Sequence, residues 1–80
     1  MTEQSRPGPD DPAEPTGAAI ARLRHQARLT GQQLGRLVTM SQAKISRIET
    51  GQTTASPDDI GRLARALGAP HDVISRLVDR

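Results

Sequence analysis

The feature that most constrains this chain is a pair of closely spaced helix-start signals between residues 30 and 51. Thr30, followed three positions later by Gln33, forms a capping box, in which hydroxyl and amide side chains satisfy free backbone groups at a helix N-terminus. Ser41 predicts a second start, because its side chain can accept from the backbone N–H groups of the next turn. The apolar residues of this stretch fit two helices that share one buried corner: Leu34, Val38, Met40, Ile45 and Ile48. The pattern therefore predicts a helix-turn-helix over residues 30–51.

The outward face of the second predicted helix is polar and basic. It consists of Gln42, Ala43, Lys44, Ser46, Arg47 and Thr50. A short helix with such a face fits the major groove of DNA. Positive charge also gathers around the motif, since residues 18–55 hold six basic side chains and one glutamate, whereas residues 1–17 are acidic. This asymmetry is typical of a phosphate-binding surface.

Composition excludes several classes of protein. Eighty residues without Phe, Tyr or Trp allow one small domain with an aliphatic core, and we expect a free energy of unfolding of about 3–5 kcal/mol. The absence of cysteine excludes disulfides, and no apolar run approaches a membrane span or a signal peptide, so we expect a cytoplasmic protein without membrane contact. His25 and His71 have no second ligand at metal spacing, and no nucleophile or phosphate loop is present. We therefore expect no metal, no cofactor and no enzyme activity.

The chain divides into an arm and a domain. Residues 1–16 are acidic and proline-rich, which predicts a disordered arm, and residues 17–80 form the domain. Thr16 is predicted to cap a first helix from Gly17 to Arg28, with Ile20, Leu23 and Ala27 on its apolar side.

Residue types also mark the end of the motif and the bounds of the helices that follow it. Gly51 suits the left-handed end of the second motif helix. Ser56 and Pro57, with two aspartates behind them, predict the start of a fourth helix that ends at Gly68. Pro70 begins a last helix, which makes five helices, no strand and an all-α fold. One side of this helix carries Val73, Ile74, Leu77 and Val78, and they can complete the core, form a dimer contact or dock a following domain.

The run SQAKISRIETG at residues 41–51 resembles the pattern SQ-x-x-I-S-R-I-E-x-G of the Cro/C1-type (xenobiotic-response-element type) helix-turn-helix family, to which phage lambda-type repressors belong. The resemblance covers roughly residues 18–70. More narrowly, the chain is similar to the N-terminal domain of actinobacterial helix-turn-helix regulators. The resemblance implies a compact lambda-repressor-like DNA-binding domain, followed by a C-terminal domain in a longer protein.

Roles of individual residues are implied by the same resemblance. Gln42 would pair with adenine and Arg47 with guanine or a phosphate, Ala43 could touch a thymine methyl, and Lys44 and Ser46 flank these positions. The implied phosphate contacts are Gln32, Gln33, Thr50 and Thr53. Arg24 and Glu49 match an ion pair that ties the first helix to the end of the recognition helix.

The chain departs from the family pattern at three positions. Gly31 stands where the family usually has a glutamine that holds phosphate, and Gly35 stands where it usually has alanine. Thr39 occupies the turn position usually held by glycine, so either the turn differs or the chain tolerates a strained backbone there. These departures bear on DNA affinity more than on the fold.

Two functions follow. The first is a sequence-specific transcriptional regulator that reads double-stranded DNA with the helix at residues 41–50. A homodimer through the last helix would place two recognition helices about 34 Å apart, on a pseudo-palindromic operator. The alternative is a protein-binding module of the same fold, such as an antitoxin or adaptor, with weak or secondary DNA binding.

Overall fold

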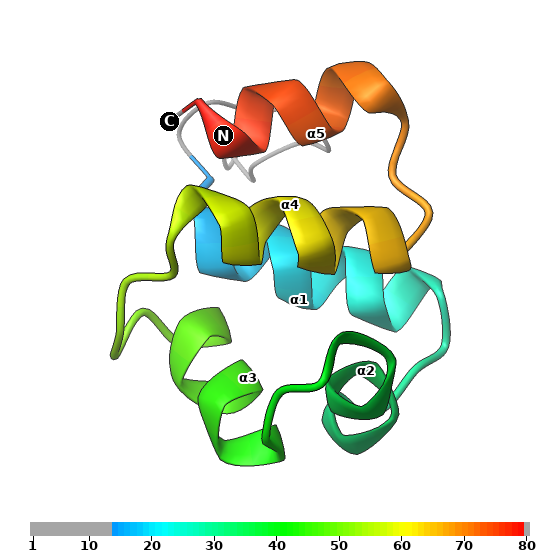
Figure 1. Ribbon diagram of the computed structural model, residues 1–80, viewed down its shortest axis with the longest axis vertical. Coiled ribbons are helices and arrows are strands. Elements are labelled where there is room, and N and C mark those ends of the chain that lie inside the picture. The colour runs from blue at the N-terminus through cyan, green and yellow to red at the C-terminus, as the bar shows by residue number, and fades with distance from the viewer. Residues whose placement is uncertain (1–13, 80) are drawn as a thin grey trace, which may run out of the picture.

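The computed structural model describes residues 14–79, and this range folds into five α-helices without a strand (Figure 1). The helices are α1 (Thr16–Gln26), α2 (Gly31–Val38), α3 (Gln42–Glu49), α4 (Pro57–Ala66) and α5 (His71–Val78). The predicted all-α, five-helix fold is confirmed for this part of the chain. Most of the predicted N-terminal arm, residues 1–13, lies outside the described range.

The helices form three layers (Figure 1). α1 and α4 lie side by side in the middle, α5 packs against α4 on one side, and α2 and α3 lie on the other. The core draws on all five helices and is entirely aliphatic: Ala19, Ile20, Leu34, Val38, Ile45, Ile48, Ile60, Leu63, Ala64 and Leu77. Met40 packs against this core from the α2–α3 turn, as the sequence pattern indicates.

Three of the four predicted helix starts with a side-chain cap are confirmed. Thr30 Oγ1 accepts from the Gln33 backbone at 3.0 Å, while the Thr30 backbone donates to Gln33 Oε1 at 2.8 Å. Ser41 Oγ accepts from the Lys44 backbone at 3.0 Å, and Ser56 caps α4 in the same way at 3.1 Å. These caps fix where α2, α3 and α4 begin because each satisfies a backbone donor that the helix itself leaves free.

The start of α1 differs from the prediction. Thr16 is the first helical residue and not the cap, because the carbonyl of Pro15 already accepts from the Ala19 backbone at 3.0 Å. Glu14 is buried and pairs with Arg22 at 3.0 Å, which fastens the chain to the second turn of α1. The helix thus starts one residue before the predicted position, next to this contact between side chains eight positions apart.

The end of α1 also differs from the prediction, which ran to Arg28. The helix ends at Gln26, and Arg28 has a left-handed backbone with φ of 60°. The Leu29 backbone then donates to the carbonyl of Arg24 at 3.1 Å, which is the closing bond of a Schellman motif. Ala27, expected on the apolar side, is exposed as a result.

Two other helices end in the same motif with glycine at its left-handed position. Gly51 follows α3 with φ of 79°, and Gly68 follows α4 with φ of 75°, so both predicted helix ends are confirmed. Thr39, after α2, is left-handed as well, with φ of 59°. The chain therefore keeps the turn and accepts the strained backbone at Thr39.

Two glycines allow close approach of backbones. A Cβ atom at Gly17 would overlap the carbonyl oxygen of Ile48, so α1 packs directly on the backbone of α3. A Cβ atom at Gly35 would overlap the carbonyl oxygen of Met40, where the turn folds back over α2. Since any larger residue would push these elements apart, both glycines help to place α3.

The apolar side of α5 faces inward. Leu77 is buried, and Val73, Ile74 and Val78 are partly buried against the core. This packing shows that these residues contribute to the core, whereas a dimer contact and the docking of a following domain through the same helix stay predictions. The exposed side of α5 is polar: His71, Asp72, Ser75, Arg76 and Asp79.

Candidate nucleic-acid interface

The surface centred on α3 follows from how that helix is anchored. Ile45 and Ile48 are buried, with 1% and 3% of their surface exposed, and they fix the rotation of the helix about its axis. The residues that this rotation leaves exposed are Gln42, Ala43, Ser46 and Arg47. Four of the five predicted base-contacting residues thus share one solvent-facing side of a single helix.

The fifth, Lys44, lies differently. Its Nζ is 3.1 Å from Asp59 Oδ2 in the first turn of α4, and its side chain is 44% exposed. Lys44 therefore spans from α3 to α4 and would have to leave a carboxylate before contacting DNA. Its predicted role at the bases stays a prediction, and the structure gives it a second role in holding α3 against α4.

The N-terminal part of α2 lies beside the start of α3. Gln32 and Gln42 line one open hollow, together with Arg36 and Thr39. The side-chain oxygen of Gln33 accepts a hydrogen bond in the capping box, and its amide N–H groups remain able to donate. A Cβ atom at Gly31 would lie 3.7 Å from Cγ of Gln42, an ordinary contact distance. The side chain that this chain lacks at position 31 would therefore fit beside Gln42.

The two predicted threonine contacts differ in how free their hydroxyls are. Thr50 Oγ1 donates to the carbonyl of Ser46 at 2.9 Å, so its one hydroxyl proton is engaged at the end of α3. Thr53 is exposed in the loop that follows, with its backbone N–H held by the carbonyl of Arg47. Of the two, Thr53 is the better placed to donate to a phosphate.

Arg24 and Glu49 form a bidentate ion pair between α1 and the end of α3. Nε of Arg24 lies 2.7 Å from Oε2 and Nη2 lies 2.9 Å from Oε1, and the two side chains are only 14% and 10% exposed. Nη1 also donates to the carbonyl of Leu29 at 2.9 Å. The hydrogen bonds and charge of Glu49 raise the pKa of Arg24, although burial acts in the opposite direction. This pair joins the end of α3 to α1.

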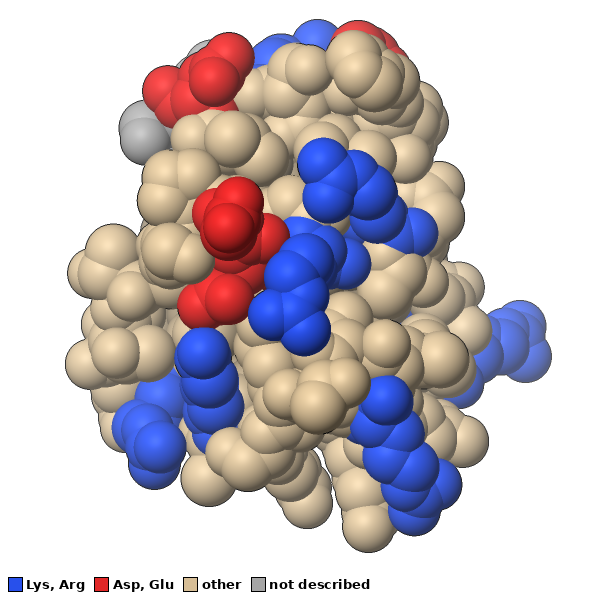
Figure 2. Space-filling view, in the orientation of Figure 1, with Lys and Arg blue, Asp and Glu red and all other residues tan. Residues whose placement is uncertain are grey.

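Positive charge dominates the part of the surface that α2 and α3 present. In Figure 2 the charged side chains visible in the lower half, over these two helices, are all basic, whereas the acidic ones lie around α4 and α5. Internal ion pairs occupy three of the six basic residues between positions 18 and 55: Arg22 with Glu14, Arg24 with Glu49, and Lys44 with Asp59. Among residues 14–79, no acidic partner is found for the other three, Arg28, Arg36 and Arg47.

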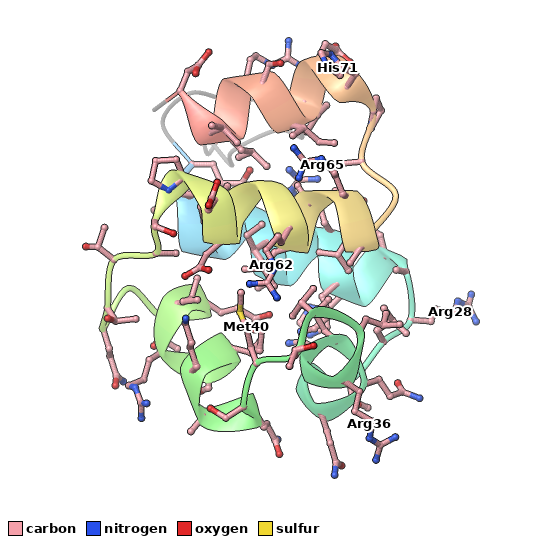
Figure 3. The ribbon with its side chains drawn as sticks, in the orientation of Figure 1. Arg28, Arg36, Met40, Arg62, Arg65 and His71 are labelled. Atoms are coloured by element: carbon pink, nitrogen blue, oxygen red, sulfur yellow. The ribbon has the colours of Figure 1, made fainter. Side chains whose placement is uncertain are left out.

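The sequence reasoning missed Arg28 and Arg36 as candidate contacts. Both are exposed, and Figure 3 shows their side chains pointing away from the domain on the side of α2. Arg36 could have been found from its position on the polar side of an amphipathic helix. Arg28 could not, because the sequence pattern placed it within the first helix and not in an exposed turn.

A model of a helix-turn-helix domain family matches residues 16–77. The match spans α1 to α5 almost completely, so the chain belongs to this helix-turn-helix domain family. No curated protein and no solved structure gives a significant match. None of the described helices is long and apolar enough to cross a membrane.

Proposed function

We propose that this domain is a sequence-specific DNA-binding transcriptional regulator that reads the major groove with α3. The observation that carries the proposal is the exposed side of α3, a helix fixed by buried isoleucines: Gln42 is exposed there, and Arg47 has no acidic partner among residues 14–79. A glutamine can pair bidentately with adenine and an arginine with guanine, each worth about 1–3 kcal/mol of discrimination. The family match supports this assignment.

The finer identity is also a proposal. The run SQAKISRIETG supports a Cro/C1-type domain of the kind found at the N-terminus of actinobacterial regulators. We propose in addition that the domain acts in the cytoplasm and without catalysis. Gln32, Gln33 and Thr53 are the proposed phosphate contacts around α3, since their polar groups are exposed and able to donate.

The symmetry of the DNA site that the domain selects tests its oligomeric state. A homodimer would select a pseudo-palindromic site with half-sites about one helical turn, ~34 Å, apart, whereas a monomer would select a single half-site. Because Leu77 is only 4% exposed, Leu77→Asp would unfold the domain and could not report on a dimer contact. The symmetry of the selected site is therefore the better readout.

One observation favours the alternative of a protein-binding module. Leu37 on α2 is 60% exposed and is the one large apolar side chain that the described residues present to solvent to this degree. A partner protein could cover it, and Gly31 removes a side chain that family members use on phosphate. The two functions separate experimentally, since a protein-binding module selects no DNA sequence.

The experiment is selection of binding sites from a pool of random duplexes, with wild type, Arg47→Ala and Arg65→Ala in parallel. Arg65 is the matched control, because it is an exposed arginine that Figure 3 places on the side of α4 that faces α5, away from α3. We expect wild type and Arg65→Ala to enrich the same motif, and Arg47→Ala to lose one position of it. Enrichment of no motif by wild type at low salt would refute the proposed function.

A further inference from the structure

The turn between α1 and α2 holds an arginine at a left-handed position that glycine fills after α3 and α4 and that Thr39 fills after α2. Arg28, Gly51 and Gly68 occupy the same left-handed position of the Schellman motifs that end α1, α3 and α4. In every residue but glycine this conformation brings Cβ close to the following carbonyl oxygen and costs free energy. The chain therefore keeps an unfavourable residue at Arg28 although glycine would form the same turn.

Packing gives no reason for an arginine at this position. Arg28 is exposed, and no hydrogen bond or ion pair joins its guanidinium to any residue in the range 14–79. Its neighbours behave differently, since Arg22 and Arg24 are both engaged by carboxylates. A strained residue with a free charged side chain points to a function outside the fold.

The position of the turn indicates which function. The turn leads directly into α2, whose first residues lie beside Gln42 at the start of α3. Figure 3 shows Arg28 pointing outward on the α2 side of the domain, with Arg36 on the same side and lower in the view. The two arginines thus extend the positive surface of α3 past α2, beyond the reach of the recognition helix itself.

We propose that Arg28 and Arg36 contact DNA phosphates that flank the base pairs read by α3. The proposal rests on the proposed DNA-binding function and adds to it a part of the footprint that carries no sequence information. A guanidinium suits a phosphate because its N–H groups form charge-assisted bonds to two oxygens at once. The strain at Arg28 is then the cost of placing a positive charge at that point of the surface.

The test compares two variants at the same position. Arg28→Gly removes the charge and relieves the left-handed strain, whereas Arg28→Lys keeps both the charge and the strain. We expect Arg28→Gly to raise the melting temperature by roughly 4 °C and to weaken DNA binding roughly 3- to 10-fold. A substitution that raises the stability of the domain and lowers its affinity for DNA identifies a residue that serves binding, because replacing a merely structural residue would not have both effects.

Salt dependence identifies phosphate as the contact. Association constants are measured between about 50 and 200 mM salt, where each neutralised phosphate contributes about −0.9 to the slope of log affinity against log salt. The probe is a duplex that carries the selected site, either with flanking base pairs or cut off at the bases that α3 reads. We expect Arg28→Gly and Arg36→Ala each to reduce the slope by about 0.9 on the long duplex and to leave it unchanged on the short one. Arg28→Lys and the control Arg65→Ala should retain the wild-type slope on both.

The outcomes separate this proposal from the function on which it rests. If wild type binds the selected site and Arg28→Gly keeps its affinity and slope on the long duplex, the flanking contact is refuted and the reading by α3 stands. If the slope falls equally on both duplexes, Arg28 contacts phosphate within the site and the flanking assignment is wrong. If wild type selects no site, the proposed function fails and this inference fails with it.

Discussion

Replacing Glu49 by glutamine tests the ion pair that holds the recognition helix. The substitution keeps the shape of the side chain, but it leaves Arg24 with a positive charge that is 14% exposed and no longer has a carboxylate partner. The amide oxygen can still accept one of the two hydrogen bonds, whereas the amide nitrogen cannot accept the other. Breaking a buried pair costs about 3–5 kcal/mol, and with one hydrogen bond retained we expect a loss of about 2–3 kcal/mol.

This loss would be large for so small a core. Against an expected free energy of unfolding of about 3–5 kcal/mol, it lowers the melting temperature by roughly 10–20 °C. Because the chain has no Phe, Tyr or Trp, unfolding is best followed by the helical circular dichroism signal in a urea titration. With a slope near 1 kcal/mol per molar urea, the midpoint should fall by about 2 M.

Asp72→Asn is the matched control. It makes the same carboxylate-to-amide change in the pair with Arg76, which is 3.3 Å long, but here the aspartate side chain is 72% exposed. Water already screens this pair, so we expect a change below about 0.5 kcal/mol. A midpoint for Glu49→Gln that matches that of Asp72→Asn would show that the Arg24 pair does not anchor α3. Conversely, Arg24→Met combined with Glu49→Leu should recover most of the lost stability, because no unpaired charge remains buried.

Three further substitutions test the packing and the DNA-facing surface. Gly17→Ala should destabilise the domain by about 1–3 kcal/mol in the same urea titration, because its Cβ overlaps the carbonyl oxygen of Ile48 and pushes α1 off α3. Thr39→Gly should stabilise it by about 1 kcal/mol, since a left-handed backbone with φ of 59° favours glycine, and an unchanged midpoint would show that the turn is not strained. Gly31→Gln should raise affinity for the selected duplex about fivefold, measured by fluorescence anisotropy, because a Cβ atom fits beside Gln42 and the new amide adds a donor near the proposed phosphate contacts.

Features set by local chemistry could be predicted from the sequence. At the starts of α2, α3 and α4, a side chain accepts a hydrogen bond from the backbone N–H three positions further along the chain. The residues that decide these helix starts are therefore close in sequence. The same holds for Gly51 and Gly68, where the residue type itself favours the left-handed turn. The buried and exposed sides of α3 follow from the spacing of Ile45 and Ile48.

Features that depend on contacts between residues distant in sequence could not be predicted from the sequence. The spacing of polar residues places Lys44 with Gln42 and Arg47, and nothing near it in sequence indicates that Asp59 on α4 would engage it. Likewise, nothing near Glu14 in sequence indicates that it pairs with Arg22 beside the start of α1, and α1 ends early because Arg28 adopts a conformation that its residue type disfavours. In each case the deciding feature is either a contact between distant residues or a backbone conformation that the residue type disfavours. The spacing of polar and apolar residues along the chain indicates neither.

The same ion pairs decide how much of the positive charge can bind DNA. Residues 18–55 hold six basic residues, but three of them are engaged by carboxylates within the domain. Those three would have to break an existing pair before they could neutralise a phosphate, so the gain from the new contact would be offset by the loss of the old one. The remaining arginines come from three different places: Arg28 from the turn before α2, Arg36 from α2 and Arg47 from α3. If they alone neutralise phosphates, the salt slope per bound chain is roughly −3, and a slope near −6 would show that the internal pairs open on binding.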